Sequence, residues 1–222
     1  FPGGKKVRSK VLIDIGSLFN INYKTLIKIG AAIECIHSYS LIHDDLPCMD
    51  NDMIRGGKPS THVKFGESTA VLAGNSLLTM AFEILSYKKL NFSEKIKIDL
   101  ISKISESSGH LGVAGGQFLD LSYEHQNVSK KKIIEMEIKK TGKLFSFCCA
   151  APAIIKKKKI QEIKFFENIG SKIGLLFQIA DDLIDLKSNS KEAGKKTGKD
   201  QKKGKATLIN LIGHDDSVKY CD

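Results

Sequence analysis

The sequence predicts an all-α protein folded as one domain, and three observations support this fold class. Apolar residues recur every three or four positions over long stretches, which is the spacing of one face of a helix. Alternating valine-rich runs joined by pairs of turn residues, which indicate strands and hairpins, are not evident. The chain has 222 residues, of which 41% are hydrophobic, and this is enough for a substantial core.

The first expected helix spans 23–45, because Leu26, Ile29 and Ile33 fall on one side of it. A second helix is expected over 67–87. This segment has so little polar interruption that we expect the helix to be buried.

A shorter amphipathic helix is expected over 93–108. Asn91 or Ser93 would cap its start, since both side chains accept hydrogen bonds from backbone N–H groups, and Gly109 would end it. Three further helices are expected, over 112–123, 129–151 and 161–186.

The segment 188–204 is polar and rich in glycine and lysine, so we expect a mobile loop there. Because it directly follows a cluster of acidic residues, it is suited to close as a lid over a bound phosphate. A disordered linker is the alternative.

The net charge is +10, yet the composition does not favour nucleic-acid binding. Of 35 basic residues only Arg8 and Arg55 are arginine, so a general bias toward lysine explains the charge. The lysine runs 130–132 and 156–159 are expected to be solvated. No basic stripe carries the interleaved aromatic residues on which bases stack. We also expect no membrane-spanning segment and no signal peptide.

The cysteines do not form a recognisable disulfide or zinc pattern. Their number is odd and no Cys-x-x-Cys pair occurs, so we expect free thiols and a cytoplasmic protein. The five are Cys35, Cys48, Cys148, Cys149 and Cys221.

The first informative motif is an aspartate cluster at the end of the helix expected over 23–45. Asp44 and Asp45 end the helical pattern, Pro47 interrupts regular helix, and Asp50 can fold back toward them. Carboxylates are hard oxygen ligands of the kind that Mg²⁺ binds.

The second motif is an aspartate cluster on the last expected helix. Asp181 and Asp185 are four residues apart and share a face, and Asp182 lies beside them. Magnesium needs only one or two carboxylates per ion together with phosphate oxygens. Two such clusters therefore predict a magnesium-dependent clamp on a diphosphate, and two solvated acidic patches are the alternative.

Cationic and amide side chains that can complete a phosphate site lie near these motifs. Lys5 and Arg8 follow a pair of glycines, and Arg55 lies five residues after the first cluster. His37 lies two helical turns before the first cluster, although a structural role is common for a single histidine. Further candidates are Lys140, Thr141, Gln178, Lys195, Lys196 and Lys205.

These motifs, taken together, resemble the trans-isoprenyl diphosphate synthases, and among them the bacterial farnesyl diphosphate synthases. The resemblance covers essentially the whole chain. It includes GGKKVRSK, AAIECIHSYSLIHDDLPCMDNDMIRGGKPSTH, KFGESTAVLAGNSLLTMAFEIL, GVAGGQFLDL, KKTGKLF, GLLFQIADDLIDL and GKKTGKDQKKGKAT.

The resemblance implies a role for each candidate. Isopentenyl diphosphate would be held by Lys5, Arg8 and His37, and magnesium by Asp44, Asp45, Asp50, Asp181, Asp182 and Asp185. The allylic diphosphate would be held by Arg55, Lys140, Thr141, Gln178, Lys205 and a loop lysine, Lys195 or Lys196. The catalytic groups would be the six aspartates with Arg55 and Lys140, and Tyr39 with Ser40 would limit chain length.

The resemblance also implies the fold and the activity. The fold would be an isoprenoid synthase helical bundle around a central diphosphate and magnesium pocket. The chain would be a single polyprenyl synthetase domain over 1–222, without the family's leading helix and closing segment. Its expected activity is head-to-tail condensation of isopentenyl diphosphate with dimethylallyl or geranyl diphosphate to give farnesyl diphosphate. We expect two or three Mg²⁺ ions per site and a homodimer.

Three other functions remain open at this point. A geranylgeranyl diphosphate synthase would differ only in the length of its product. A catalytically weakened paralogue or partner subunit would keep the fold without full turnover. A terpene cyclase is disfavoured, because Lys5, Arg8 and His37 would have no second diphosphate to bind.

One departure from the family pattern yields a prediction. The family usually has two adjacent arginines after the first cluster, whereas here Gly56 follows Arg55. The second arginine is expected to contact isopentenyl diphosphate, and a hydrogen bond to a charged group contributes about 1.5–3 kcal/mol. A Gly56→Arg variant should therefore lower the KM for isopentenyl diphosphate in steady-state kinetics. An unchanged KM would refute this role for the position.

Overall fold

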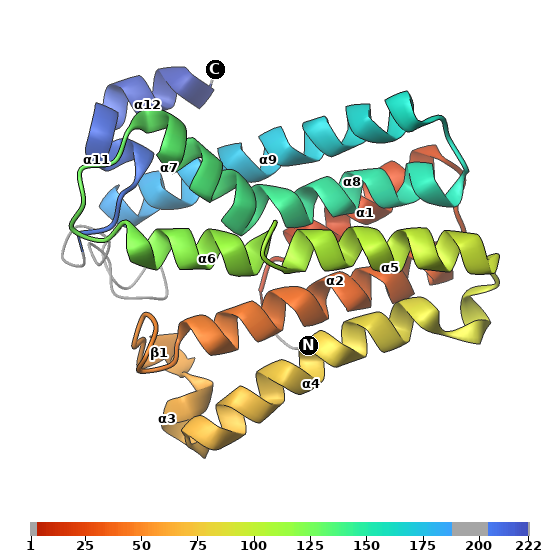
Figure 1. Cartoon of the computed structure of the whole chain (residues 1–222), viewed down its shortest axis with the longest axis horizontal. Coiled ribbons are helices and arrows are strands. Elements are labelled where there is room, and N and C mark those ends of the chain that lie inside the picture. The colour runs from red at the N-terminus through yellow and green to blue at the C-terminus, as the bar shows by residue number, and fades with distance from the viewer. Residues whose placement is uncertain (1–3, 188–203, 222) are drawn as a thin grey trace.

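Helices make up almost all of the regular structure in the described part of the chain, as the sequence predicts (Figure 1). The structure is a computed structural model. It describes residues 4–187 and 204–221, with backbone alone for 185–187.

The first half contains α1 (Val7–Leu18), α2 (Tyr23–Asp44), α3 (Thr61–Phe65), α4 (Glu67–Ser86), the 3-10 turn η1 (Lys88–Leu90) and α5 (Glu94–Ser108). A short hairpin pairs β1 (Ile54–Arg55) with β2 (Lys58–Pro59). The second half contains α6 (Val113–Ser122), α7 (Lys130–Glu137), the π-helical turn η2 (Ile138–Gly142), α8 (Lys143–Ile155), α9 (Ile160–Lys187), α11 (Leu208–Ile212) and α12 (His214–Cys221).

Helix α2 is the central helix of the larger hydrophobic core. Asn22 caps its start by accepting a hydrogen bond from the backbone N–H of Lys24. Leu26, Ile29 and Ile33 are fully buried, so the predicted apolar face is confirmed. They pack with side chains of α1, α4, α5 and α8 in one cluster.

A second, smaller cluster lies beneath the C-terminal part of the chain. Ile133 and Met136 of α7 pack there with Ile179 of α9 and Leu208 of α11. The cluster attaches the segment after residue 203 to the helical bundle, because Leu208 is fully buried in it.

One end of the bundle collects the chain segments that carry the predicted site. Figure 1 shows that α2, α6 and α9 all have their C-terminal ends on the left side of the view, beside β1, α3 and α11. Residues that are more than a hundred positions apart in the sequence therefore meet at this end.

The segment 129–151, expected as one helix, is divided by the π-helical turn η2 into α7 and α8, and α8 continues to Ile155. Glycines let neighbouring helices approach this turn. A Cβ at Gly116 of α6 would lie 2.1 Å from the backbone nitrogen of Lys140, and one at Gly174 of α9 would lie 2.5 Å from the Cα of Gly142. Such distances exclude any side chain at these two positions.

Two expectations about the first half are wrong. Helix α4 was expected to be buried, but only Ala70, Gly74, Ala81 and Leu85 are buried in it, because α2, α3 and α5 cover one side alone. The hairpin was not expected. Its turn is Gly56–Gly57, with φ of 57° and 75°, and such left-handed pairs suit a two-residue hairpin loop.

Three other expectations about local structure are confirmed. Ser93 caps α5 by accepting from the Ile96 N–H, and Gly109 follows its last residue. The lysine runs 130–132 and 156–159 are exposed. The expected loop 188–204 lies outside the described residues except for its last position.

Two helices, α2 and α4, are long and apolar enough to cross a membrane by length and composition alone. This differs from the expectation of no membrane-spanning segment. Half of the apolar window of α2 is buried within the bundle, against 22% of that of α4. The core helix of a soluble protein meets the same test, so the finding is weak evidence for a membrane span.

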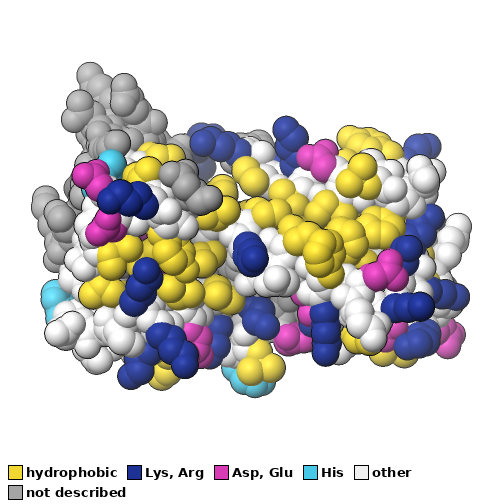
Figure 2. All heavy atoms as spheres, turned by 90° about the horizontal axis from the view of Figure 1, so that it is seen from above, with side chains coloured by type: hydrophobic (Ala, Val, Ile, Leu, Met, Phe, Trp, Pro, Cys, Tyr) yellow, Lys and Arg dark blue, Asp and Glu magenta, His cyan; other side chains and the backbone are white. Residues whose placement is uncertain are grey.

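The outer side of α9 and α12 also exposes hydrophobic side chains. Figure 2, which views the molecule from above, shows hydrophobic groups on this side bordered by lysines. They include Ile160, Phe165 and Leu176 of α9 and Val218 and Tyr220 of α12.

Candidate active site

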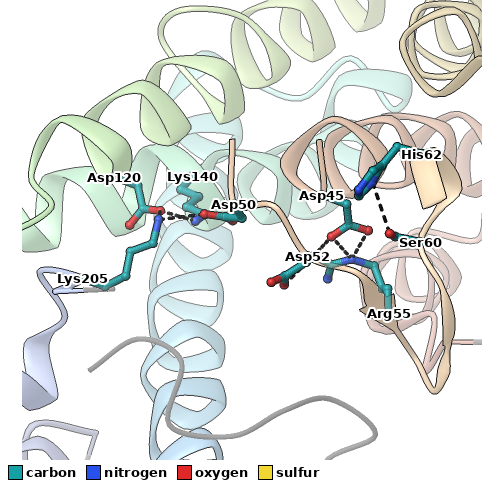
Figure 3. A network of polar contacts seen from close by, with 9 residues as sticks. All are labelled: Asp45, Asp50, Asp52, Arg55, Ser60, His62, Asp120, Lys140 and Lys205. Carbon is teal, nitrogen blue, oxygen red and sulfur yellow. Dashed lines mark hydrogen bonds and ion pairs between the residues drawn. The ribbon is translucent and has the colours of Figure 1, made fainter. Parts of the chain in front are cut away.

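The first aspartate cluster divides into two parts with different partners (Figure 3). Asp45 is buried, and both of its oxygens accept from the Nε–H of Arg55 at 2.8 Å. A second guanidinium nitrogen of Arg55 also donates to Asp45, and Asp52 lies 3.9 Å from it. The carboxylate of Asp45 therefore faces Arg55 in this structure and can hold its guanidinium group in one orientation.

Asp44 lies in surroundings that disfavour its charge. Burial raises the pKa of Asp44 to about 6, and the nearby carboxylates of Asp50 and Asp120 act in the same direction. Lys140 and Arg55 oppose this shift without cancelling it. A carboxylate in this state gains from an additional cation.

The other part of the cluster belongs to a network that reaches across the site (Figure 3). Lys205 donates to Asp50 at 3.0 Å and to Asp120 at 2.6 Å, and Lys140 donates to the same oxygen of Asp120 at 2.8 Å. Glu124 lies 2.9 Å from the ammonium of Lys205. The network joins α6, η2, the loop after α2 and the segment after residue 203.

Lys205 is well buried for a lysine, with 7% of its surface exposed. Burial alone would lower the pKa of Lys205, but the carboxylates of Asp120 and Asp50 outweigh burial and raise it above its ordinary value. Burial also favours a lower pKa for Lys140, and Asp120 and Asp44 reverse this effect. Both lysines are therefore cations.

The turn η2 connects this network to the second aspartate cluster. Thr141, adjacent to Lys140, donates to the side-chain oxygen of Gln178 at 2.8 Å. Gln178 in turn donates through its amide nitrogen to Asp182 at 2.8 Å. Neighbouring residues of one π-helical turn thus contact both clusters, which accords with the frequent occurrence of such turns at functional sites.

The remaining residues of the second cluster lie on α9. Asp181 is partly buried and lies close enough to Arg8 to stabilise its charge. Asp185 is on the same helix, but its side chain lies outside the described residues. Lys195 and Lys196, the two alternatives for the loop lysine, also lie outside them.

Arg8 occupies an aromatic pocket next to His37. Its guanidinium carbon lies 5.0 Å from the ring centre of Phe145 and 5.6 Å from that of Phe177, and such cation–π contacts stabilise a buried arginine. One guanidinium nitrogen is 3.3 Å from Nε2 of His37. The buried Nε–H of Arg8 has no hydrogen-bond partner among the described groups, so it is available to an anionic ligand.

His37 is neutral, because burial first, and then the positive charges of Arg8, Arg55 and Lys6, lower its pKa to about 3. Arginine can only donate, so Nε2 of His37 accepts from Arg8 and the ring proton lies on Nδ1. His37 can therefore orient Arg8 and offer one N–H, but it adds no positive charge.

The N-terminal lysines differ in their contacts. Lys6 forms an ion pair of 3.5 Å with the buried Glu34, which also accepts from the hydroxyl of Ser9 at 2.5 Å. Lys5 is exposed just before α1. The Glu34 contacts fix the start of α1, which carries Arg8, against α2.

Gly56 lies at the tip of the hairpin, next to Arg55. A Cβ added there meets no atom within 4 Å, so an arginine has room. Its φ of 57° is left-handed, however, and this conformation costs an ordinary residue about 1–2 kcal/mol. A Gly56→Ala variant is the matched control for Gly56→Arg, because it has the backbone strain without the charge.

The two predicted chain-length residues differ in position. Tyr39 is buried between α2 and α5, and its hydroxyl donates to the backbone oxygen of Ser108 at 3.3 Å. Burial raises its pKa to about 12, so it stays neutral. Ser40 donates to the backbone oxygen of His37 in its own helix and is partly buried.

Sequence reasoning missed three buried polar residues near the site. Asp120 is one, although a single acid in the apolar stretch of α6 was a usable signal. Gln117, one turn earlier, has no partner for either amide atom among the described groups. Glu137 is 2% exposed, and burial raises its pKa to about 7 although the Leu208 backbone amide opposes this.

The residues present fit magnesium. The donors of Asp44, Asp50, Asp181 and Asp182 are carboxylate oxygens, the type of ligand that Mg²⁺ prefers. Among the described side chains, no three histidine, cysteine, aspartate or glutamate groups are arranged to hold a metal by themselves. Mg²⁺ keeps several waters and takes oxygens from a bound phosphate, so it needs few protein ligands.

Comparisons with known proteins agree with this site. A family model described as polyprenyl synthetase matches residues 1–219. The farnesyl diphosphate synthase of Bacillus subtilis is 38% identical over 95% of this chain and 71% of its own length.

Two solved structures have the same fold over almost the whole of this chain. An FPP/GFPP synthase from Zymomonas mobilis has a TM-score of 0.88 and 38% identity, over 100% of this chain and 74% of that one. A geranyltransferase from Helicobacter pylori, complexed with magnesium and isoprenyl diphosphate, has a TM-score of 0.88 and 34% identity, over 99% of this chain and 73% of that one.

Proposed function

This chain belongs to the polyprenyl synthetase family, and from this premise we propose which of its residues carry out each part of the reaction. The chain is a trans-prenyltransferase of the farnesyl diphosphate synthase type. It joins isopentenyl diphosphate head to tail with dimethylallyl or geranyl diphosphate, which yields farnesyl diphosphate and pyrophosphate. One observation carries the assignment of residues: a carboxylate and lysine network lies next to a separate arginine site.

The allylic diphosphate binds at the carboxylate and lysine network. When bound, Mg²⁺ supplies charge neutralisation at the departing diphosphate. We propose two or three ions per site, held by Asp44 and Asp50 with Asp181, Asp182 and Asp185. Asp45 completes the first cluster by orienting Arg55.

Cationic side chains of this chain stabilise the charge that develops on the leaving diphosphate. Lys140 and Lys205 lie beside Asp50 and Asp120, and Arg55 lies at the hairpin next to Asp45. A loop lysine, Lys195 or Lys196, is the fourth cation of this proposal. Thr141 and Gln178 supply dipoles near the allylic carbon chain, and their mutual hydrogen bond fixes their orientation.

Isopentenyl diphosphate binds at the N-terminal site. Arg8 offers its unpartnered Nε–H, His37 orients Arg8, and the exposed Lys5 adds a second cation. Gly56 leaves this substrate one arginine short, so we expect its binding to be weakened. The double bond attacks the allylic cation, and the departing pyrophosphate takes the proton that is lost.

Magnesium-dependent turnover tests this function. We expect the full-length protein to convert geranyl and isopentenyl diphosphates to farnesyl diphosphate with Mg²⁺ and not with EDTA. Asp44→Asn should lower kcat by about 10²–10³-fold, the usual effect of losing one group that stabilises the transition state electrostatically. Asp99→Asn is the control, because the Asp99 side chain on α5 is 43% exposed and pairs only with Lys95 among the described contacts. A folded wild-type protein without turnover would instead support the weakened paralogue.

Tyr39 provides a second test, which concerns product length. Its buried ring lies one turn and a half before the first cluster, where we propose that it closes the pocket for the growing chain. Tyr39→Ala should shift the products toward geranylgeranyl diphosphate and longer chains in product chromatography. Tyr39→Phe keeps the ring and loses only the hydrogen bond to Ser108, so it should still make farnesyl diphosphate. Unchanged products from Tyr39→Ala would remove Tyr39 from this role.

We propose that the protein works in the cytoplasm as a homodimer. Cys35, Cys48, Cys148 and Cys149 are free thiols, as in a reducing compartment. The exposed apolar residues of α4, α5, α6 and the turn between α5 and α6 form the surface that a second copy would cover. They are Leu72, Met80, Ile98, Leu111 and Phe118.

Light scattering coupled to size-exclusion chromatography tests the dimer. The wild-type protein should have about twice the chain mass of 24.5 kDa, and Phe118→Lys should shift it toward the monomer. Phe165→Lys changes an equally exposed aromatic residue on α9 and should leave the mass unchanged. A monomeric wild-type protein would refute the homodimer.

A further inference from the structure

Asp120 is the one residue of the network that contacts both of its lysines through a single atom. Its Oδ2 accepts from Lys140 at 2.8 Å and from Lys205 at 2.6 Å (Figure 3). It lies on α6, whereas the lysines come from η2 and from the segment after residue 203. Nothing in the activity described above assigns Asp120 a role.

We propose that Asp120 is a positioning residue that holds the ammonium groups of Lys140 and Lys205 together as a clamp for the allylic diphosphate. This rests on the proposed binding of that diphosphate by the two lysines. Asp120 itself is not proposed to touch the substrate, since a carboxylate and a phosphate repel each other.

The geometry requires such an anchor. Two ammonium groups on one oxygen are at most 5.4 Å apart, the sum of the contacts of 2.8 and 2.6 Å. At this separation two cations repel each other in a partly buried site. A single carboxylate between them offsets the repulsion and uses one of the three N–H groups of each lysine. On Lys205 the other two face Asp50 and Glu124, so a bound diphosphate would have to compete with those carboxylates.

Asp120 is also well suited to be the rigid member of the group. It is 5% exposed, and its helix is pressed against η2 by the contact of Gly116 with the backbone of Lys140. Lysine side chains have long flexible stems, so their ammonium groups need a fixed partner to keep one arrangement. Fixing both before substrate arrives reduces the ordering cost at binding.

The clamp is tied to the first aspartate cluster as well. Lys205 also donates to Asp50 at 3.0 Å, although the two residues are 155 positions apart. Loss of Asp120 would therefore leave Lys205 with Asp50 and Glu124, and it would remove the carboxylate that pairs with Lys140 among the described residues.

Pyrophosphate binding in EDTA tests the clamp without magnesium and without turnover. By isothermal titration calorimetry on the full chain, Asp120→Asn should raise the Kd for pyrophosphate about tenfold or more, in line with the loss of charge-assisted hydrogen bonds. Asp99→Asn is the control, because it also neutralises one carboxylate, but that carboxylate is 43% exposed and paired with Lys95 on α5, so the Kd should change less than about twofold. Thermal unfolding of both variants verifies that they are folded.

Steady-state kinetics give a readout that a purely structural role would not produce. Asp120→Asn should raise the KM for geranyl diphosphate and leave the KM for isopentenyl diphosphate unchanged, since only the first substrate meets the two lysines. Equal changes in both KM values would overturn the proposal.

A double-mutant cycle covers the case in which Asp120→Asn does not fold. If Asp120 makes Lys140 and Lys205 act as one unit, Lys140→Met and Lys205→Met together should weaken pyrophosphate binding no more than either change alone. Independent, multiplicative effects would refute the clamp. Wild-type protein that binds no pyrophosphate in EDTA, or Asp120→Asn that binds it more tightly, would do so too. These binding results do not depend on turnover, so a failure of the proposed activity remains distinguishable from a failure of the clamp.

Discussion

Repulsion among buried carboxylates is the constraint on which the arrangement of this site depends. Asp44 and Asp50, from the end of α2 and the loop after it, meet Asp120 of α6 at one end of the bundle, where burial makes the charges of Asp44 and Asp120 costly. Each cation of the network is placed to offset this cost. Lys205 contacts both Asp50 and Asp120, and Lys140 contacts the same oxygen of Asp120. The requirement for charge balance thus fixes how the ends of α2, α6 and η2 come together.

The ion pairs of the site differ in how they form. Asp45 and Arg55 are ten positions apart, so a short hairpin with two glycines is enough to join them. Lys205 and Asp50 are 155 positions apart, so their contact depends on the packing of most of the bundle. The smaller hydrophobic cluster makes this possible, because Leu208 holds the segment after residue 203 against α7 and α9. Apolar packing therefore brings the second lysine to the aspartates, and electrostatics then fixes its position.

The sequence predicts the parts of this protein that have a local signal. Helical periodicity locates α2, α5 and α9 within a residue or two, since one face of each meets the core. The prediction that α4 is buried is wrong, because an apolar composition does not show which neighbours cover a helix. The turn η2 was missed for a similar reason. Its widening depends on the close approach of Gly116 and Gly174, and these contacts come from helices far away in sequence.

In the candidate site too, residues with a local sequence signal were found and residues that depend on distant contacts were missed. The aspartate clusters were found by their spacing, and Lys205 was found near the second of them, but Asp120 was not. Nothing within four residues of Asp120 balances its charge, and its partners are 20 and 85 positions away. His37 was found, but its neutral state could not be predicted from the sequence, because it depends on burial and on three cations around it.

In the proposed assignment the two substrate sites differ in their electrostatics, and this difference favours departure of the allylic diphosphate. The proposed allylic site contains carboxylates that would bind metal ions. Lys140 and Lys205 would stabilise the negative charge on the departing diphosphate. The isopentenyl site is built around Arg8, which is stacked on two phenylalanine rings and contacted by a neutral histidine. An arginine fork holds a diphosphate in the ground state, but it supplies less charge neutralisation than metal ions with lysines do. The allylic diphosphate departs because it leaves a resonance-stabilised allylic cation, whereas isopentenyl diphosphate would leave an unstabilised primary cation. The proposed magnesium and lysine site then stabilises the charge that develops on the departing group.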